Sequence, residues 1–426
     1  MRIEYSARTD VGRRRPHNED SITVDDSLGL FLVCDGMGGH ASGEVASRVA
    51  AETITAGVSE RIDEIRASLA ATSVDERKVA TEVMRSIVIE GNRAVRALAE
   101  EDEEHRGMGT TLSLLLVWGT RALVAHVGDS RVYLARGGQV HQVTTDHTIL
   151  TEMIRAGRVK EVEAAKVRHL NALTRAVGVY PTVDVDLMEL DVLPDDIFLV
   201  CSDGLHGYLD NFDLHTFLTH SEPGSAADDL VDFANKQGGH DNISAVVAYA
   251  RDGQETEQTQ RIRLTLDTLR NLPLFHYLTF GELLKVINVC RTMLIGPGTS
   301  VISGGDGGDD FFIIVDGVLR VHAGEHELAR LEKGNHFGEM SLIDNRPRSA
   351  SVTSEGAAHL IRITRADFYE LLRQDSVMAV KLLWNFIQTL SSVIRMQNEE
   401  KNPVATQSRP DGFAHPYSRE DDDEKQ

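Results

Sequence analysis

The sequence is poor in cysteine, which argues against a fold stabilised by disulfides or by a cysteine-bound zinc ion. Only three cysteines occur, Cys34, Cys201 and Cys290, far apart and without a CxxC pair. Neither a disulfide framework nor a cysteine-based zinc site is therefore expected. Cys34 and Cys201 lie inside apolar runs, and we interpret them as small buried hydrophobic residues.

Long apolar runs and excess positive charge are also missing. No segment approaches ~18 unbroken apolar residues, and the first ten, MRIEYSARTD, lack the apolar core of a signal peptide. The formal net charge is −22, from 44 Lys and Arg against 66 Asp and Glu. We therefore expect no membrane partner, no nucleic-acid partner and a cytoplasmic location. An acidic surface remains compatible with multivalent cations.

The 426 residues are enough for two or three domains. Up to about residue 250, candidate strands alternate with helix-spaced apolar positions at 42–60, 76–100 and 224–236. The candidate strands of this part are 29–34, 111–118, 122–128, 131–136, 196–202 and 243–250.

The rest of the chain differs in composition and in the spacing of its apolar residues. A polar stretch at 251–271 predicts a linker or connecting helix, and glycine-spaced short strands with later helices predict a small β-barrel or jelly roll over 272–398. The charged, proline-containing end, 399–426, predicts a disordered acidic tail. The first domain is accordingly placed at 1–250.

Aspartates at the ends of apolar strands are the first chemical signal. The stretch FLVCDGMGGH puts Asp35 after a strand, but the GxxxxGK[ST] string of a phosphate loop does not occur. Four further aspartates lie at strand ends, namely Asp20, Asp129, Asp203 and Asp241. Each alone is an ordinary turn residue, whereas all five together suggest a site for Mg²⁺ or Mn²⁺, which prefer oxygen ligands. Two such ions can activate a water molecule for attack on phosphorus.

Seven motifs in order carry a resemblance that makes this reading specific. They are RxxNED at 15–20, VCDGMGGH at 33–40, GTT at 109–111, VGDSR at 127–131, LTRAVG at 173–178, CSDGL at 201–205 and DNIS at 241–244. Together they resemble the metal-dependent Ser/Thr protein phosphatases of type 2C, in their compact bacterial style. The resemblance covers about residues 1–250 and implies a sandwich of two antiparallel sheets flanked by helices.

The resemblance also implies roles for individual residues. Asp35 would bridge two metal ions, with the Gly36 carbonyl on one of them, and Asp203 and Asp241 would hold the other. Asp20 would act mainly through a metal-bound water. The remaining implied roles are a third, weaker metal at Asp129, a substrate phosphate at Arg15, and tight backbone turning at Gly38 and Gly39.

The general acid is left open. Some relatives have a histidine two residues after the first metal aspartate, whereas this chain has Met37, as bacterial members do. His40 lies nearby and is equally well read as a helix-entry residue, and a metal-bound water is the other donor. We interpret His147 and His240, which adjoin acidic residues, as supporting or structural.

A second chemical signal lies in FGEMSLIDNRPRSASV, residues 337–352. Arg348 could bind a phosphate and Glu339 could accept a hydrogen bond from a ribose hydroxyl. A turn of a β-barrel with a surface Glu and Arg is equally compatible with this sequence. The segment 272–395 resembles the cyclic-nucleotide-binding domain of the catabolite activator protein and of kinase regulatory subunits. That resemblance implies contacts from Glu339 to the ribose and from Arg348 to the cyclic phosphate. Gly338, Ser349 and Ala350 would line the pocket.

The predicted fold class is therefore α+β: a four-layer α-β-β-α sandwich of two antiparallel sheets, followed by a β-jelly-roll domain with flanking helices. The predicted function is hydrolysis of phosphoserine and phosphothreonine in proteins with two, or three, Mn²⁺ or Mg²⁺ ions, under the control of cyclic AMP or cyclic GMP. The substrates would be proteins phosphorylated by a cognate Ser/Thr kinase. No helix-turn-helix follows, so a DNA-binding regulator is not expected.

Two alternatives remain open at this stage. The first is a scaffold that has the phosphatase fold and recognises phosphoproteins without catalysis. The second is an active phosphatase whose C-terminal domain docks a partner and binds no nucleotide.

Overall fold

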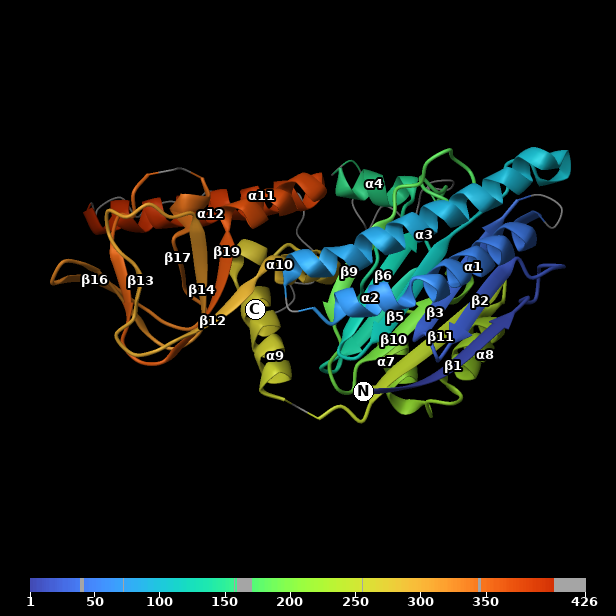
Figure 1. Ribbon diagram of the computed structural model, residues 1–426, viewed down its shortest axis with the longest axis horizontal. Helices are drawn as coiled ribbons and strands as arrows, with labels where there is room; N and C mark the ends of the chain where they lie inside the picture. Colours follow the sequence, from blue (N-terminus) through green and yellow to red (C-terminus); the bar gives the residue numbers. More distant parts are fainter. Residues whose placement is uncertain are drawn as a thin grey trace. The chain divides into compact units, whose positions relative to one another are not determined.

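The computed structural model describes residues 1–38, 42–71, 73–156, 158, 171–254, 256–343 and 346–401. The chain divides into two compact units, Met1–Thr256 and Glu257–Gln426. Each unit is described by itself below and is drawn in Figure 1. Gly39, His40 and the tail from residue 402 lie outside the described residues, and the predicted domain boundaries stay predictions.

The first unit contains two antiparallel sheets. The five-stranded sheet has the order β1-β11-β10-β7-β8, and the six-stranded sheet has the order β2-β3-β5-β6-β9 with β4 beside β3. The strands of the first are β1 Arg2–Asp10, β11 Ile243–Arg251, β10 Ile197–Cys201, β7 Arg131–Arg136 and β8 Gln139–Gln142. Those of the second are β2 Asp20–Asp25, β3 Leu30–Met37, β4 Gly109–Thr110, β5 Leu112–Trp118, β6 Arg121–Val127 and β9 Asp186–Asp191.

The central strands are apolar on both faces, which requires a covering layer on each side. Residues 243–250 of β11 are all buried, as are the first six residues of β5. One face of each sheet packs on the other sheet, and the other face is covered by helices (Figure 1). The four-layer sandwich predicted from the sequence is thereby confirmed.

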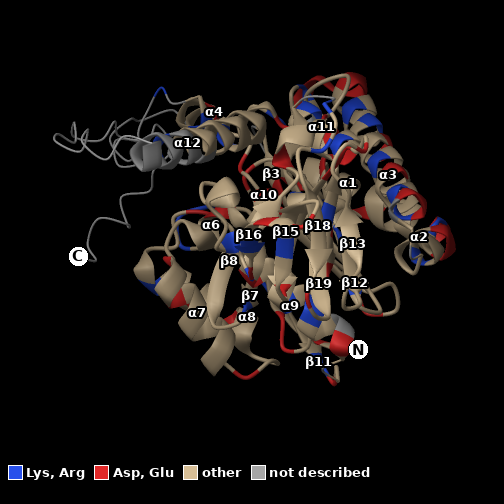
Figure 2. Ribbon diagram, turned by 90° about the vertical axis from the view of Figure 1, so that its left-hand side faces the viewer, with Lys and Arg blue, Asp and Glu red and all other residues tan. Residues whose placement is uncertain are grey.

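Two groups of helices form the outer layers. On the six-stranded sheet lie α1 and α3, with α2 packed on α3, and on the five-stranded sheet lie α6, α7 and α8. Their bounds are α1 Ser42–Glu60, α2 Ile62–Leu69, α3 Val74–Glu101, α6 Asp203–His206, α7 Asn211–His220 and α8 Ala226–Gln237, with η1 Glu103–His105 and α4 Ile149–Arg155 completing the unit. Acidic and basic residues are interspersed along α3 in Figure 2, as on a solvated helix face.

The second unit contains two four-stranded antiparallel sheets with a core between them. The orders are β12-β19-β14-β17 and β13-β18-β15-β16. Phe312 and Leu360 of one sheet and Leu319 and Val352 of the other belong to one buried cluster. The strands are β12 Arg291–Ile295, β13 Ser300–Ile302, β14 Asp310–Asp316, β15 Leu319–Ala323, β16 His326–Leu331, β17 His336–Phe337, β18 Ser351–Ser354 and β19 Ala358–Thr364.

Helices flank this pair of sheets on the N-terminal and C-terminal sides of the chain. They are α9 Glu257–Arg270, η2 Pro273–Phe275 and α10 Phe280–Val289 before the strands, and α11 Arg365–Gln374 and α12 Ser376–Lys401 after them. The short η3 Glu339–Leu342 lies between β17 and β18. Thr279 and Glu282 form a capping box at the start of α10. The predicted β-domain with flanking helices is confirmed. In the part of the chain that the structure describes, no helix is long and apolar enough to cross a membrane.

Candidate active site and a second anion site

Strand pairing brings the first two aspartates together. Asp20 begins β2, Asp35 lies near the end of β3, and the two are direct partners in the antiparallel register. Asp20 is 7% exposed, and its Oδ2 accepts hydrogen bonds from the hydroxyls of Ser202 at 2.8 Å and Ser244 at 2.6 Å. Ser244 belongs to β11 of the other sheet and Ser202 directly follows β10 of that sheet, so Asp20 lies where the two sheets meet.

Asp203 and Asp241 complete the cluster from the five-stranded sheet. Asp203 is the first residue of α6, two residues after the end of β10, and its carboxyl interacts electrostatically with those of Asp35 and Asp241. Asp241 lies just before β11, and its Oδ2 accepts a 2.7 Å hydrogen bond from Nη2 of Arg15. The structure therefore gathers at one end of the sandwich four predicted metal ligands and the predicted phosphate-binding arginine.

Burial of like charges perturbs the titration of this cluster. Burial first, and then the charges of Asp203 and Asp241, raise the pKa of Asp20 to about 7, against the opposing serine hydrogen bonds. Burial and the neighbouring carboxylates also raise the pKa of Asp35 well above its ordinary value, and they raise that of Asp203. Bringing several carboxylates together out of water is unfavourable unless a cation or protons compensate.

The residues present fit divalent cations on two observations. The donors are carboxylate oxygens, the ligands that Mg²⁺ and Mn²⁺ prefer. In addition, Oδ1 of Asp20 is buried and has no hydrogen-bond partner among the described residues. Within those same ranges, no group of three or more His, Cys, Asp or Glu side chains is placed so that it could by itself hold a metal ion. Ions that keep several waters do not need one.

Gly36 shows why the backbone beside Asp35 excludes larger residues. Its N–H donates to the Glu19 carbonyl at 3.1 Å, and a Cβ added to it would lie 2.1 Å from the Gly43 carbonyl oxygen. Thr111 holds the preceding residue, because its Oγ1 accepts from the Asp35 N–H at 2.9 Å. The Gly36 position, predicted as a carbonyl ligand, is therefore held in place by close backbone packing.

Asp129 lies between β6 and β7, and its carboxyl interacts electrostatically with the cluster. Burial, followed by the charges of Asp203 and Asp146, raises the pKa of Asp129 to about 7. The loop before it is held by His147, whose Nδ1 accepts from the Gly128 N–H at 3.1 Å. The predicted third-metal residue thus interacts electrostatically with Asp203.

Two histidines near the site, His147 and His240, make structural contacts. His147 is buried and its Nε2 lies 3.3 Å from a carboxylate oxygen of Asp186. His240 is exposed and contacts the Tyr208 hydroxyl through Nδ1. Met37 is partly buried at the end of β3. The general acid therefore stays unassigned.

Sequence reasoning missed the neutral groups that hold the carboxylates. Ser202 and Ser244 stand inside the motifs CSDGL and DNIS, and their positions one residue before Asp203 and three after Asp241 were the available signal. Asn242 was also missed. Its side-chain oxygen accepts from the Glu19 N–H at 2.9 Å, and its amide donates to the Val11 carbonyl at 3.0 Å.

A buried arginine forms a separate site in the second unit. Arg348 is 9% exposed, and its Nη2 donates to the Asp310 carbonyl at 2.9 Å and its Nη1 to Oγ of Ser341 at 3.1 Å. Among the described residues it has no carboxylate within ion-pair distance, and burial lowers its pKa. A buried guanidinium bonded only to neutral acceptors is suited to an anion.

The residues predicted to line the pocket with Arg348 differ in how directly they contact it. Gly338 has a φ of 80°, and a Cβ there would lie 2.8 Å from Nη1 of Arg348. Glu339, the next residue, begins η3 and acts electrostatically on Arg348. Ser349 is exposed and Ala350 half-buried on the segment that leads into β18.

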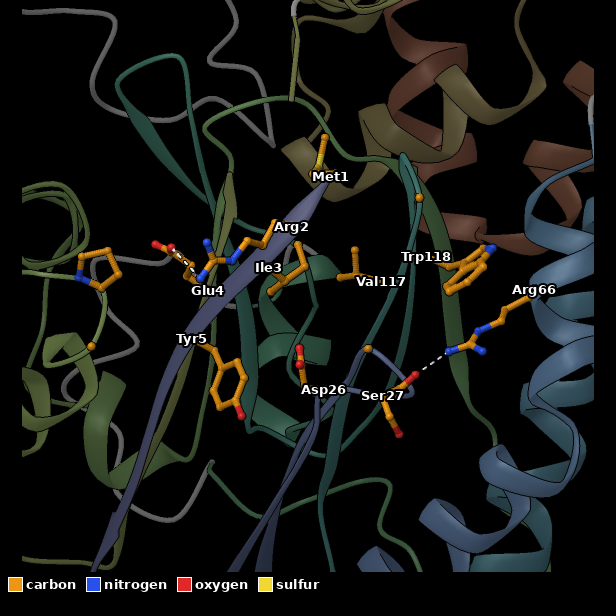
Figure 3. Close-up of a pocket in the computed structure, with 14 residues that line it drawn as sticks. Met1, Arg2, Ile3, Glu4, Tyr5, Asp26, Ser27, Arg66, Val117 and Trp118 are labelled. Carbon is orange, nitrogen blue, oxygen red and sulfur yellow. Dashed lines mark hydrogen bonds and ion pairs between the residues drawn. The ribbon is translucent and has the colours of Figure 1, made fainter. Parts of the chain in front are cut away.

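A different hollow lies at the other end of the sandwich. Figure 3 shows this pocket of about 610 Å³, where Arg66 stacks on Trp118 with its Cζ 4.0 Å from the ring centroid. Ser27, whose carbonyl accepts from Arg66 at 2.6 Å, follows the end of β2 opposite to Asp20. The pocket is therefore separate from the carboxylate cluster.

Comparison with known proteins agrees with this geometry. Residues 13–246 match the family model described as protein phosphatase 2C. The chain belongs to the protein phosphatase 2C family. Residues 294–375 match the model described as cyclic nucleotide-binding domain. The predicted fusion and the predicted enzyme class, a protein-serine/threonine phosphatase, are confirmed.

Individual relatives share the first unit. The chain is 35% identical to the serine/threonine phosphatase stp of Listeria monocytogenes over 253 residues, 58% of this chain and 95% of the relative. It is 31% identical to protein phosphatase PhpP of Streptococcus pneumoniae, over 58% of this chain and 96% of that protein. The structure of the Mycobacterium tuberculosis phosphatase PstP/Ppp matches with a TM-score of 0.52 at 32% identity, covering 59% of this chain and 100% of that one.

One solved relative bears on the cofactor. The catalytic domain of the phosphatase PstP, in complex with two manganese ions, matches with a TM-score of 0.50 at 32% identity, over 59% of this chain and 99% of that one. The predicted cofactor class, Mn²⁺ or Mg²⁺, is thereby confirmed for the family.

Proposed function

We propose that the cluster of Asp20, Asp35, Asp203 and Asp241 holds two Mn²⁺ or Mg²⁺ ions and hydrolyses phosphoserine and phosphothreonine in proteins. The observation that carries the proposal is the convergence of carboxylates from both sides of the sandwich on the buried Asp20, one of whose oxygens has no partner among the described residues. Asp129 would contribute to a third, weaker ion, and the Gly36 carbonyl would complete the set.

Each group has a stated task in this proposal. Bound divalent cations would neutralise the phosphoryl oxygens and acidify a water molecule for attack on phosphorus. Arg15 is 46% exposed at its side chain and would bind the substrate phosphate through its planar guanidinium. Asp241, which now accepts from Arg15, would release it for this purpose. The serine hydroxyls on Asp20 would keep that carboxylate oriented.

Turnover of a phosphothreonine peptide in MnCl₂ tests the proposal. Asp35→Asn or Asp203→Asn is expected to lower kcat by about 100-fold or more, because the charge that attracts the cations is removed. Asp25→Asn, at the opposite end of β2, is the matched control and should retain full activity. Unchanged turnover in the first two variants would refute the assignment, and wild-type binding of the phosphopeptide without hydrolysis would favour the scaffold alternative.

We further propose that Arg348, Gly338, Glu339, Ser349 and Ala350 bind the cyclic phosphate and ribose of cyclic AMP or cyclic GMP. The buried guanidinium bonded only to neutral acceptors supports this. Calorimetry on the full chain should show binding of one of the two nucleotides, and Arg348→Ala should abolish it. Arg346→Ala, two residues away and exposed, serves as control. If neither nucleotide gives a heat of binding with the wild type, the alternative that the C-terminal domain docks a partner and binds no nucleotide would be favoured.

Regulation follows if the nucleotide stabilises one conformation of the chain more than another. The phosphatase rate should then change on addition of the bound nucleotide in the wild type and not in Arg348→Ala. The protein substrates would be those of a cognate Ser/Thr kinase. A protein that meets both phosphoproteins and cyclic nucleotides would act in the cytoplasm, and this location stays a prediction.

A further inference from the structure

A run of three arginines lies in the connection from β1 to β2, beside the candidate active site. Arg13, Arg14 and Arg15 are the only three consecutive basic residues in a chain whose net charge is −22. All three are exposed. Arg15 has a task in the proposed function, whereas Arg13 and Arg14 have none so far.

Close packing holds this run against the loop that presents Asp241. The Arg13 N–H donates to the Gly239 carbonyl at 2.7 Å, two residues before Asp241. Gly239 has a φ of 52°, and a Cβ added to it would lie 2.8 Å from Cγ of Arg13. Glycine at this position therefore leaves the space that the stem of Arg13 occupies, and Arg13 stays next to the site.

Arg13 and Arg14 differ from Arg15 in their partners. Arg15 pairs with Asp241 at 2.7 Å and lies 4.0 Å from Glu19. Among the described residues, no carboxylate lies within ion-pair distance of Arg13 or Arg14. An unpaired arginine offers its N–H donors in a planar fork that matches carboxylate and phosphate groups.

The chain geometry limits how far these donors lie from the phosphate that Arg15 would bind. Consecutive Cα atoms are about 3.8 Å apart, so those of Arg13 and Arg15 are separated by at most about 7 Å. A bound peptide in an extended conformation advances roughly 3.3 Å per residue. A second anion within about three residues of the phosphorylated residue is therefore in reach of Arg13 or Arg14.

We propose that Arg13 and Arg14 bind a second anionic group of the substrate. The enzyme then prefers phosphoserine and phosphothreonine that have an acidic residue or another phosphate within a few residues. Because Arg15 is taken as the phosphate ligand, this preference rests on the proposed function. Both kinds of group accept bidentate hydrogen bonds from arginine, and the local positive charge offsets the repulsion that a strongly acidic protein exerts on acidic peptides.

Kinetics of the full chain in MnCl₂ on three phosphothreonine peptides tests the preference. One peptide has neutral flanks, one has glutamates two residues to either side, and one has a non-hydrolysable phosphonate analogue of phosphothreonine there. The wild type should show a kcat/KM about 3- to 5-fold higher for the glutamate peptide than for the neutral one. The phosphonate peptide should gain more, because each such group carries nearly two charges.

Two further readouts separate this contact from a structural effect. The gain should appear in KM and not in kcat, because the contact is made equally before and in the transition state. It should also shrink when the salt concentration is raised from about 0.05 M to about 0.5 M, because exposed charges are screened. A larger gain with glutamate than with phosphonate would identify acidic residues as the recognised group, and the reverse order would identify a second phosphate.

Charge variants assign the preference to the two arginines. The double variant Arg13→Gln/Arg14→Gln should hydrolyse all three peptides with similar kcat/KM. Arg14→Glu should disfavour the glutamate peptide relative to the neutral one, and this exposed residue can be replaced without disturbing the packing of Arg13 on Gly239. Arg2→Gln, at the opposite end of β1, makes the same change in charge and should keep the wild-type preference.

Equal kcat/KM for the neutral and anionic peptides in the wild type would overturn the proposal. A preference that persists in the double variant would do the same. If the wild type hydrolyses none of the peptides, the proposed catalytic function fails instead. The dissociation constants of the same peptides, measured by fluorescence anisotropy, then decide whether Arg13 and Arg14 bind a second anion, with the same order of the peptides expected.

Discussion

Asp20 is a residue whose position lowers the stability of the ion-free protein. Its carboxylate is buried beside other acids, and no positive charge among the described residues pairs with it directly. Placing such a group there is unfavourable for folding, so its position reflects a requirement of the site. The two serine hydroxyls offset part of this cost.

Replacement of this residue should therefore separate stability from ion binding. Asp20→Asn, measured in EDTA at pH 8, should be at least as stable as the wild type and more stable by on the order of 1–3 kcal/mol if the serine hydrogen bonds persist. Addition of MnCl₂ should raise the unfolding midpoint of the wild type much more than that of the variant. Ser27→Ala, at the far end of the same hairpin, is the control. A strongly destabilised Asp20→Asn in EDTA would contradict the prediction.

His126 gives a pH dependence of the opposite origin. Burial first, and the neighbouring His147 second, lower the pKa of His126 to about 4. Below its ordinary pKa of 6.5 the unfolded chain binds a proton that the folded chain does not bind, so stability is lost as the pH falls from 6.5 towards 4. The loss is roughly 3 kcal/mol at most.

The difference between wild type and His126→Gln isolates this contribution from other titrating groups. The free energy of unfolding, from urea denaturation at fixed EDTA, should fall more steeply with acidification in the wild type than in the variant between pH 6.5 and 4. Parallel curves would show that His126 is accessible to protons in the folded state.

At the scale of elements, one buried ion pair joins two helices of the second unit. Lys381 of α12 and Glu282 of α10 are 10% and 6% exposed at their side chains. Removing one partner of such a pair leaves a buried charge uncompensated, which typically costs 3–5 kcal/mol, roughly.

Lys381→Met should accordingly lower the free energy of unfolding of the second unit by about 3 kcal/mol, and with it the melting temperature. The double variant with Glu282→Gln should recover most of this loss, because no charge is then left unpaired. Lys285, which pairs with Asp375 at a more exposed position, provides the control through Lys285→Met. Calorimetric melting of these four proteins and of the single variant Glu282→Gln checks the comparison, and additive losses in the double variant would contradict it.

At the scale of the whole molecule, two units with separate cores and separate proposed ligand sites should unfold in two steps. Saturating MnCl₂, at about 100 times its dissociation constant, should stabilise the first unit by about 2.7 kcal/mol. EDTA should reverse this shift. A cyclic nucleotide should shift the other transition.

Calorimetric scans with each ligand alone provide the measurement. Energetic coupling between the units would appear as a shift of both transitions by one ligand, which is the thermodynamic condition for regulation. Independent shifts would argue against control of the phosphatase by nucleotide.

The sequence by itself predicted the central strands and the identities of the charged site residues, whereas the more polar strands β1, β2 and β9 were not predicted. Uninterrupted apolar runs such as 111–118 and 243–250 could only be strands covered on both faces, and the order of the aspartate motifs was sufficient to place Asp35 and Asp203 in one family pattern. Only the tertiary structure decided which neutral groups bind the site carboxylates, as Asp20 shows. The hydroxyls of Ser202 and Ser244 reach Asp20 from another sheet, more than 180 residues away in the chain. The physical reason is that local patterning sets which face of an element is buried, whereas hydrogen-bond partners across a core depend on how whole sheets pack.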